Sequence, residues 1–94
     1  NGHIIRFKEG TGAAAATSFT WDVYLFGAES GADSSKINLS SLTADQDFSS
    51  PDGLAFSPYT GICWIQTDDG AYTDVTNNMM LAALPGGAVP VVTK

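Results

Sequence analysis

Apolar and polar side chains alternate along much of this chain, which is the pattern of half-buried β-strands. The first such run is Gly2–Lys8, and the clearest is Thr17–Phe26. Within the second run, every other residue from Phe19 to Leu25 is apolar, so these side chains share one face. The opposite face ends in Tyr24 and Phe26. A strand that is apolar on both faces is expected to lie between packed layers.

The second half of the chain predicts four more strands joined by short or moderate connections. Pro58–Gly61 is a tight turn sequence, because proline suits the first central position of a turn and glycine readily adopts a positive φ. A second turn is expected at Pro85–Gly87. No segment has a convincing helical pattern, so the predicted fold class is all-β with antiparallel strands. The four expected strands are Leu54–Ser57, Ile62–Thr67, Met79–Leu84 and Ala88–Thr93.

Between the two halves lies Gly27–Asp47, a stretch rich in Ser, Ala, Gly and Asp with weak periodicity. Structureless stretches of this length are uncommon inside compact domains, so a surface insertion is expected here. Its middle would be tethered by Ile37, Leu39 and Leu42. Asn38 also begins an Asn-Leu-Ser triplet that fits a glycosylation sequon, although such triplets are frequent by chance.

The two halves share an order of elements that suggests a repeat. An asparagine, a hydrophobic strand, a connector and a second strand occur near Asn1 and again near Asn78. A slice through a β-propeller would give this order, with about one and a half blades. On this interpretation, 1–26 holds the last two strands of one blade, 27–47 is a loop insertion, and 48–94 is one four-stranded blade. A free-standing six-stranded sheet or sandwich is the alternative.

Composition and charge narrow the possible functions. The 94 residues are 44% hydrophobic and 15% charged, which is typical of a folded chain. The formal net charge of −6 argues against nucleic-acid binding, because phosphate contacts require clustered lysine and arginine. No apolar stretch approaches the length of a membrane span. The single cysteine, Cys63, lies in an apolar run and is expected to be buried. Since the chain does not begin with methionine, we expect an internal piece of a longer protein.

Several short motifs together resemble one family. These are Ser50–Phe56, Trp64–Asp68, Gly2–Arg6, Thr20–Asp22 and Asn77–Ala83. The combination is similar to the PhoX-type calcium-dependent alkaline phosphatases, and it covers most of the chain outside 27–47. The Pro-Asp-Gly-Leu part alone occurs in many propellers. Its combination with Trp-Ile-Gln-Thr-Asp and Gly-His-Ile-Ile-Arg is much more specific.

The resemblance implies a parent protein that is a six-bladed propeller hydrolysing phosphate monoesters. It implies calcium ions and iron in the central channel, and a periplasmic or secreted location. Two positions depart from the family pattern: Cys63 stands where leucine is usual, and Met80 where glutamine is usual. Cys63 is therefore not the family's metal-binding cysteine, and most of the metal ligands lie outside this chain.

Two residues are candidates for the site, and no catalytic residue is assigned. Asp52, just before an inner strand, is the candidate metal ligand, because calcium prefers carboxylate oxygens. Its alternative role is a turn residue that bonds its own backbone before Gly53. Arg6 is the candidate phosphate-binding residue, because a guanidinium can bind phosphate with two parallel hydrogen bonds. Its alternative is a solvated side chain or an ion pair with an acid such as Glu9.

The remaining chemical groups have simpler interpretations. Asp68 and Asp69 form either a second oxygen cluster or a turn before Gly70, and Asn77 and Asn78 are expected to cap that loop. His3 is expected to be a packed or half-exposed strand residue. Trp21 and Trp64 are expected in the core between blades.

Three functions follow from these observations. The first is a phosphatase piece that is inactive alone, because a shared metal site needs the remaining blades. The second is a piece of another propeller hydrolase, such as a lactonase-like enzyme. The third is a non-enzymatic binding or assembly module. Open strand edges favour pairing with the remaining blades or with other copies of the chain.

Overall fold

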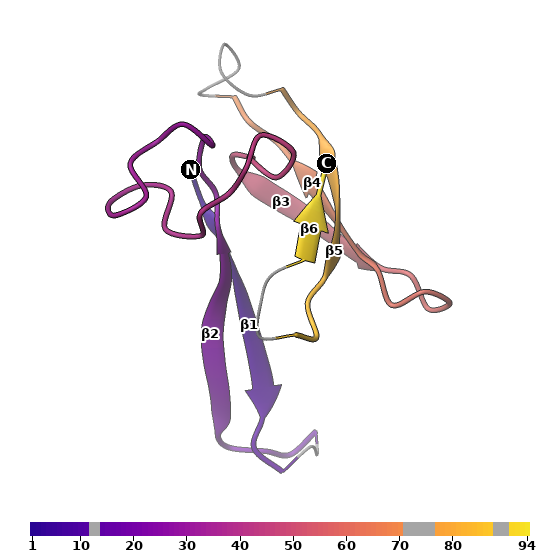
Figure 1. Ribbon diagram of the computed structural model, residues 1–94. Helices are drawn as coiled ribbons and strands as arrows, with labels where there is room; N and C mark the ends of the chain where they lie inside the picture. Colours follow the sequence, from indigo (N-terminus) through magenta and orange to yellow (C-terminus); the bar gives the residue numbers. More distant parts are fainter. Residues whose placement is uncertain (12–13, 71–76, 88–90) are drawn as a thin grey trace.

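The computed structural model describes residues 1–11, 14–70, 77–87 and 91–94. Within these ranges the chain forms antiparallel β-strands and no helix, as expected. The first two strands make a two-stranded sheet, and the other four make a second sheet in the order β3-β4-β5-β6 (Figure 1). The strands are β1 (His3–Glu9), β2 (Phe19–Phe26), β3 (Pro51–Phe56), β4 (Cys63–Thr67), β5 (Met80–Leu84) and β6 (Val91–Thr93).

The first sheet is a hairpin that extends away from the second sheet (Figure 1). The register pairs Ile4 with Leu25 but Ile5 with Val23, so Tyr24 has no residue opposite it. This bulge breaks the strict alternation expected for β2. As a result, the consecutive residues Tyr24 and Leu25 are both buried.

The outer half of this hairpin carries exposed aromatic residues. Trp21, expected in the core between blades, is 62% exposed in this chain, and its place between blades stays a prediction. Phe7 and Phe19 are also exposed, and their rings meet edge to face with centroids 5.9 Å apart. Phe7, Phe19 and Trp21 therefore form an exposed apolar surface on the outer half of the hairpin. Trp64, from the second sheet, is half-buried.

The second sheet follows the predicted strands closely, with one difference at its start. The chain turns tightly between β3 and β4, where Gly61 has a φ of 73° as the turn sequence requires. The Ser57 N–H donates to the Ile62 carbonyl at 2.9 Å and closes this turn. β3 begins at Pro51, three residues before the predicted start at Leu54. Of the predicted last strand, residues 88–90 lie outside the described residues.

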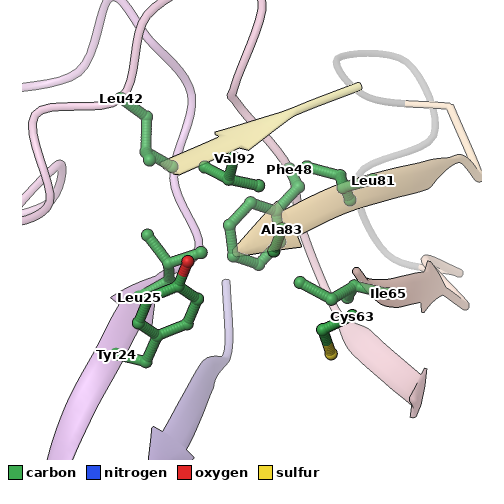
Figure 2. Close-up of a cluster of buried hydrophobic side chains, with 9 residues drawn as sticks. All are labelled: Tyr24, Leu25, Leu42, Phe48, Cys63, Ile65, Leu81, Ala83 and Val92. Carbon is green, nitrogen blue, oxygen red and sulfur yellow. The ribbon is translucent and has the colours of Figure 1, made fainter. Parts of the chain in front are cut away.

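The core lies where the buried ends of the two sheets meet (Figure 2). β2 supplies Tyr24 and Leu25, and the second sheet supplies one or two residues from each of β4, β5 and β6. Leu42 and Phe48 complete the cluster from the connection between the two sheets. The core residues are Tyr24, Leu25, Leu42, Phe48, Cys63, Ile65, Leu81, Ala83 and Val92.

The connecting segment 27–47 supplies one side chain to the core and contacts the second sheet. Leu42 is 4% exposed, as a tether should be, but Ile37 and Leu39 are half exposed and do not act as tethers. The segment also bonds to the last strand: the Gln46 Nε2 donates to the Val92 carbonyl at 3.2 Å. It thereby covers part of the open edge of β6.

The overall dimensions reflect the projecting hairpin. The radius of gyration is 14.2 Å, against about 12 Å expected for a compact domain of this length. Among the described residues, no helix is long and apolar enough to cross a bilayer.

Candidate functional site

Asp52 is presented by an irregularity at the start of β3. Pro51 pairs with Thr67 and Gly53 with Gln66, so Asp52 is an extra residue in a β-bulge. Bulges redirect side chains and are frequent next to active sites. The Asp52 side chain is exposed and borders a cleft of about 250 Å³ whose other wall comes from β1. The cleft is lined by His3, Ile4, Ile5, Pro51, Asp52 and Leu54.

The backbone immediately before Asp52 is held in an unusual conformation. Ser50 has a φ of 54°, in the left-handed region that residues other than glycine rarely adopt. Its N–H donates to the Asn1 carbonyl at 2.8 Å, and its own carbonyl accepts from the Asp68 N–H at 3.0 Å. These two bonds fix the chain on both sides of Ser50. They also place the start of β3 beside the first residues of the chain.

Asp69 lies beneath this corner as a buried carboxylate, 2% exposed. The Ser50 hydroxyl donates to its Oδ1 at 3.5 Å, and the Asp69 N–H donates to the Asn78 side-chain oxygen at 2.5 Å. Asn78 therefore caps the loop, as predicted. Asp68 is exposed, so the two neighbouring aspartates do not face the same surroundings.

The described residues fit only part of the metal centre that the motif resemblance implies. No group of three or more His, Cys, Asp or Glu side chains within the described ranges is arranged to hold a metal ion. Asp52 and His3 line the same cleft, which offers one carboxylate and one imidazole. Calcium takes six to eight oxygen ligands, so these residues alone do not form such a centre.

Arg6, the second predicted site residue, is engaged in contacts within the chain. Its Nε donates to Asp22 Oδ1 at 3.0 Å and its Nη2 donates to Asp22 Oδ2 at 2.5 Å. Its Nη1 donates to the carbonyls of Pro85 at 2.6 Å and Gly87 at 3.0 Å. The ion-pair partner is thus Asp22 on the opposite strand, and not Glu9. These partners already occupy the Arg6 guanidinium in the folded chain. Binding of phosphate by Arg6 therefore stays a prediction.

The ion pair shifts the pKa values of both members. The hydrogen bonds from Arg6 lower the pKa of Asp22, and the carboxylate raises the pKa of Arg6. Cys63 behaves differently: it is 5% exposed, and burial raises the pKa of its thiol. A protonated, buried thiol is a poor nucleophile, which fits the expected structural role.

The geometry therefore defines an antiparallel all-β chain with a carboxylate presented beside a cleft, where two strands from different sheets meet. The sequence matches the family described as Alkaline phosphatase PhoX over residues 1–93. The chain belongs to this family. No curated protein and no solved structure matches it.

The tertiary structure adds two features that the sequence motifs did not reveal. His3 shares the cleft with Asp52, although 48 positions of sequence lie between them. Arg6 meets Asp22 because the two residues are directly opposite in the hairpin register. Counting outward from the predicted strands Gly2–Lys8 and Thr17–Phe26 places Arg6 opposite Phe19, three positions short of its actual partner Asp22. No comparable signal in the sequence links His3 to Asp52.

Proposed function

We propose that this chain is part of a phosphatase that hydrolyses phosphate monoesters in the periplasm or outside the cell. The observation that carries the proposal is the family match over residues 1–93, nearly the whole chain. The motifs around Asp52 lie within the matched region, so the resemblance and the bulge geometry concern the same residues. The calcium and iron implied by the resemblance are part of this proposal.

We further propose that the chain forms about one and a half propeller blades and is inactive by itself. Four consecutive strands pair in chain order in the second sheet, as the strands of a blade would, and the hairpin contributes two more. The exposed aromatic residues Phe7, Phe19 and Trp21 give the hairpin an apolar surface that further blades would cover.

Asp52 is proposed as one ligand of a metal centre completed by residues from other blades. Three observations support this role. The side chain is exposed, the bulge directs it away from the regular ladder, and His3 lies along the same cleft. The carboxylate is also a suitable ligand for a hard cation.

The test uses the full-length protein that contains this chain and a chromogenic phosphomonoester. Hydrolysis is measured with calcium, after chelation, and in the Asp52→Asn variant, which keeps the size of the side chain and removes its charge. We expect chelation to abolish activity. Since even indirect metal contacts typically contribute about 10- to 100-fold, we expect Asp52→Asn to lower kcat/KM by at least about 10-fold.

The matched control is Asp45→Asn, an exposed aspartate in the segment that bonds to β6, at the opposite edge of the sheet from β3. Its activity is expected to stay at the wild-type level. Full activity of Asp52→Asn would return this residue to a turn role. A full-length protein that hydrolyses lactones and leaves phosphomonoesters intact would contradict the phosphatase assignment.

A further inference from the structure

A second cleft, which shares Ile4, Ile5 and Leu54 with the one beside Asp52, separates the hairpin from the four-stranded sheet. Its volume is about 390 Å³, and its walls are mainly apolar. Cys63, the only cysteine of the chain, forms part of the wall. Arg6 of β1 and the 85–87 turn form one rim of the cleft. The wall includes Tyr24, Phe56, Cys63, Ile65, Arg6 and Gly86.

Arg6 joins the two sides of this rim. The Arg6 guanidinium donates two parallel hydrogen bonds to the carboxylate of Asp22 on the neighbouring strand. This pair fixes the direction of the planar guanidinium. The guanidinium also lies 5.5 Å from the centre of the Tyr24 ring. Held in this way, it directs Nη1 at two carbonyl oxygens of the turn, those of Pro85 and Gly87. The contact therefore spans from the first sheet to the second.

A second polar contact lies close to the first. The Tyr24 hydroxyl donates to the Val91 carbonyl at 3.3 Å, where β6 begins. The two sheets share no strand ladder, since every paired strand of the described residues has its partner in its own sheet. Apart from the buried side chains of the core, these contacts from Arg6 and Tyr24 connect the hairpin to the 85–87 turn and to the start of β6.

We propose that Arg6 is a latch that holds the hairpin against the 85–87 turn and limits how far this second cleft opens. Releasing it lets the two sheets move apart at this rim by a local opening, without unfolding of the chain. Opening exposes Cys63, which is only 5% accessible in the latched state. Arg6 and Asp22 thus act as positioning residues for the relative placement of the two sheets. This inference is independent of the phosphatase proposal.

The single cysteine makes the latch measurable in the chain as it stands. The rate of Cys63 modification by a thiol reagent is measured under native conditions, beside the free energy of unfolding from urea titration. Arg6→Gln removes the charge and the bidentate pair. Losing one or two such bonds changes an opening equilibrium by about tenfold, so we expect about tenfold faster modification. High salt is expected to accelerate modification of the wild-type chain, because it screens the partly exposed pair.

The matched control is Lys94→Gln, which breaks the ion pair between Lys94 and Asp47. Neither of these residues lines the cleft. The control should leave the rate of Cys63 modification unchanged, apart from any change in global stability. Equal acceleration by Lys94→Gln and Arg6→Gln at equal stability would overturn the latch, as would an unchanged rate in Arg6→Gln.

A further variant covers the case in which Arg6→Gln does not fold. Asp22→Asn removes the charged partner but leaves Arg6 able to bond the two turn carbonyls. The expected rate of Cys63 modification in Asp22→Asn lies between the rates of the wild type and of Arg6→Gln. A folded Asp22→Asn variant with wild-type modification and no salt dependence would show that the carboxylate does not hold the latch, and would refute the proposal.

Discussion

Asn38 shows how much a single side chain organises in the connection between the sheets. It is 3% exposed, its Nδ2 donates to the Leu42 carbonyl at 3.0 Å, and its Oδ1 accepts the Leu42 N–H at 2.8 Å. A third bond reaches the Ser30 carbonyl at 3.3 Å. The amide therefore holds in place the loop that carries the buried Leu42. The sequon at this position is closed to a glycan while the loop keeps this structure.

We expect Asn38→Ala to lower the free energy of unfolding by about 1–3 kcal/mol, because buried backbone groups lose their partners. Urea denaturation followed by circular dichroism measures the change. Asn77→Ala serves as the control, since Asn77 is exposed and its loss should cost less than about 0.5 kcal/mol. An equal loss in both variants would mean that the Asn38 bonds contribute nothing specific.

Residue types alone could nominate Asp52 and Arg6 as site residues. They could not show that Asp52 is exposed beside a cleft while Arg6 is bonded to other residues of the chain. The Pro-Asp-Gly motif nominated Asp52 as a metal ligand, which stays a prediction, and the structure places this residue exposed in a bulge beside a cleft. The isolated position of Arg6 in a strand did not reveal its partners. Pro85 and Gly87 lie about 80 positions away in sequence, and only the folded chain brings their carbonyls to the guanidinium.

At the scale of elements, the hairpin β1–β2 depends on the charge state of Asp22. The hydrogen bonds from Arg6 lower the pKa of this carboxyl in the folded chain. The stabilisation is therefore present above the ordinary value of about 3.9, and it is lost as the pH falls through the lower folded value. Acid should loosen the hairpin first at its contact with the 85–87 turn.

This predicts a specific difference between two variants in acid. Thermal unfolding is measured at pH 7 and at about pH 3, close to the pKa range of carboxyl groups. The wild-type chain should lose stability between these values, and Asp22→Asn should lose less, because it has no carboxylate to protonate. Asp45→Asn, away from Arg6, should retain the acid sensitivity of the wild type. Identical losses in the two variants would assign the acid effect to other carboxyl groups.

The strands themselves were largely predictable from local pattern. Alternation and turn sequences placed all six, and the paired strands begin or end within a few residues of the expected positions. The exception at β3 has a physical cause. Pro51 and Asp52 interrupt the alternation, yet pairing with Thr67 extends the strand through a bulge that the pattern does not encode.

At the scale of the whole molecule, the exposed apolar surface of the hairpin is the feature that most favours association. Phe7, Phe19 and Trp21 are each more than 60% exposed, and the hairpin extends away from the rest of the chain (Figure 1). A two-stranded ribbon is marginally stable when it stands alone. An exposed apolar surface of this kind favours association with further blades or with other copies.

We therefore expect the isolated chain to self-associate in a concentration-dependent way, as measured by sedimentation velocity. Replacing Phe7 and Trp21 together by threonine, which keeps a good strand former, should shift the chain towards monomer. Tyr59→Ser is the control, because Tyr59 is 97% exposed but lies in the β3–β4 turn. A monodisperse wild-type monomer at all concentrations would count against the propeller-slice interpretation.

The sequence by itself determined the all-β class, the approximate position of each strand, the family and the presented carboxylate at Asp52. These properties depend on neighbours within a few positions, where alternation and turn chemistry act. The tertiary structure decided how the two sheets meet: the bulge at Tyr24, the core contribution of Leu42, and the contact of Arg6 with the 85–87 turn. Such features depend on contacts between residues far apart in the chain, and no local pattern specifies which of the possible contacts the packed core selects.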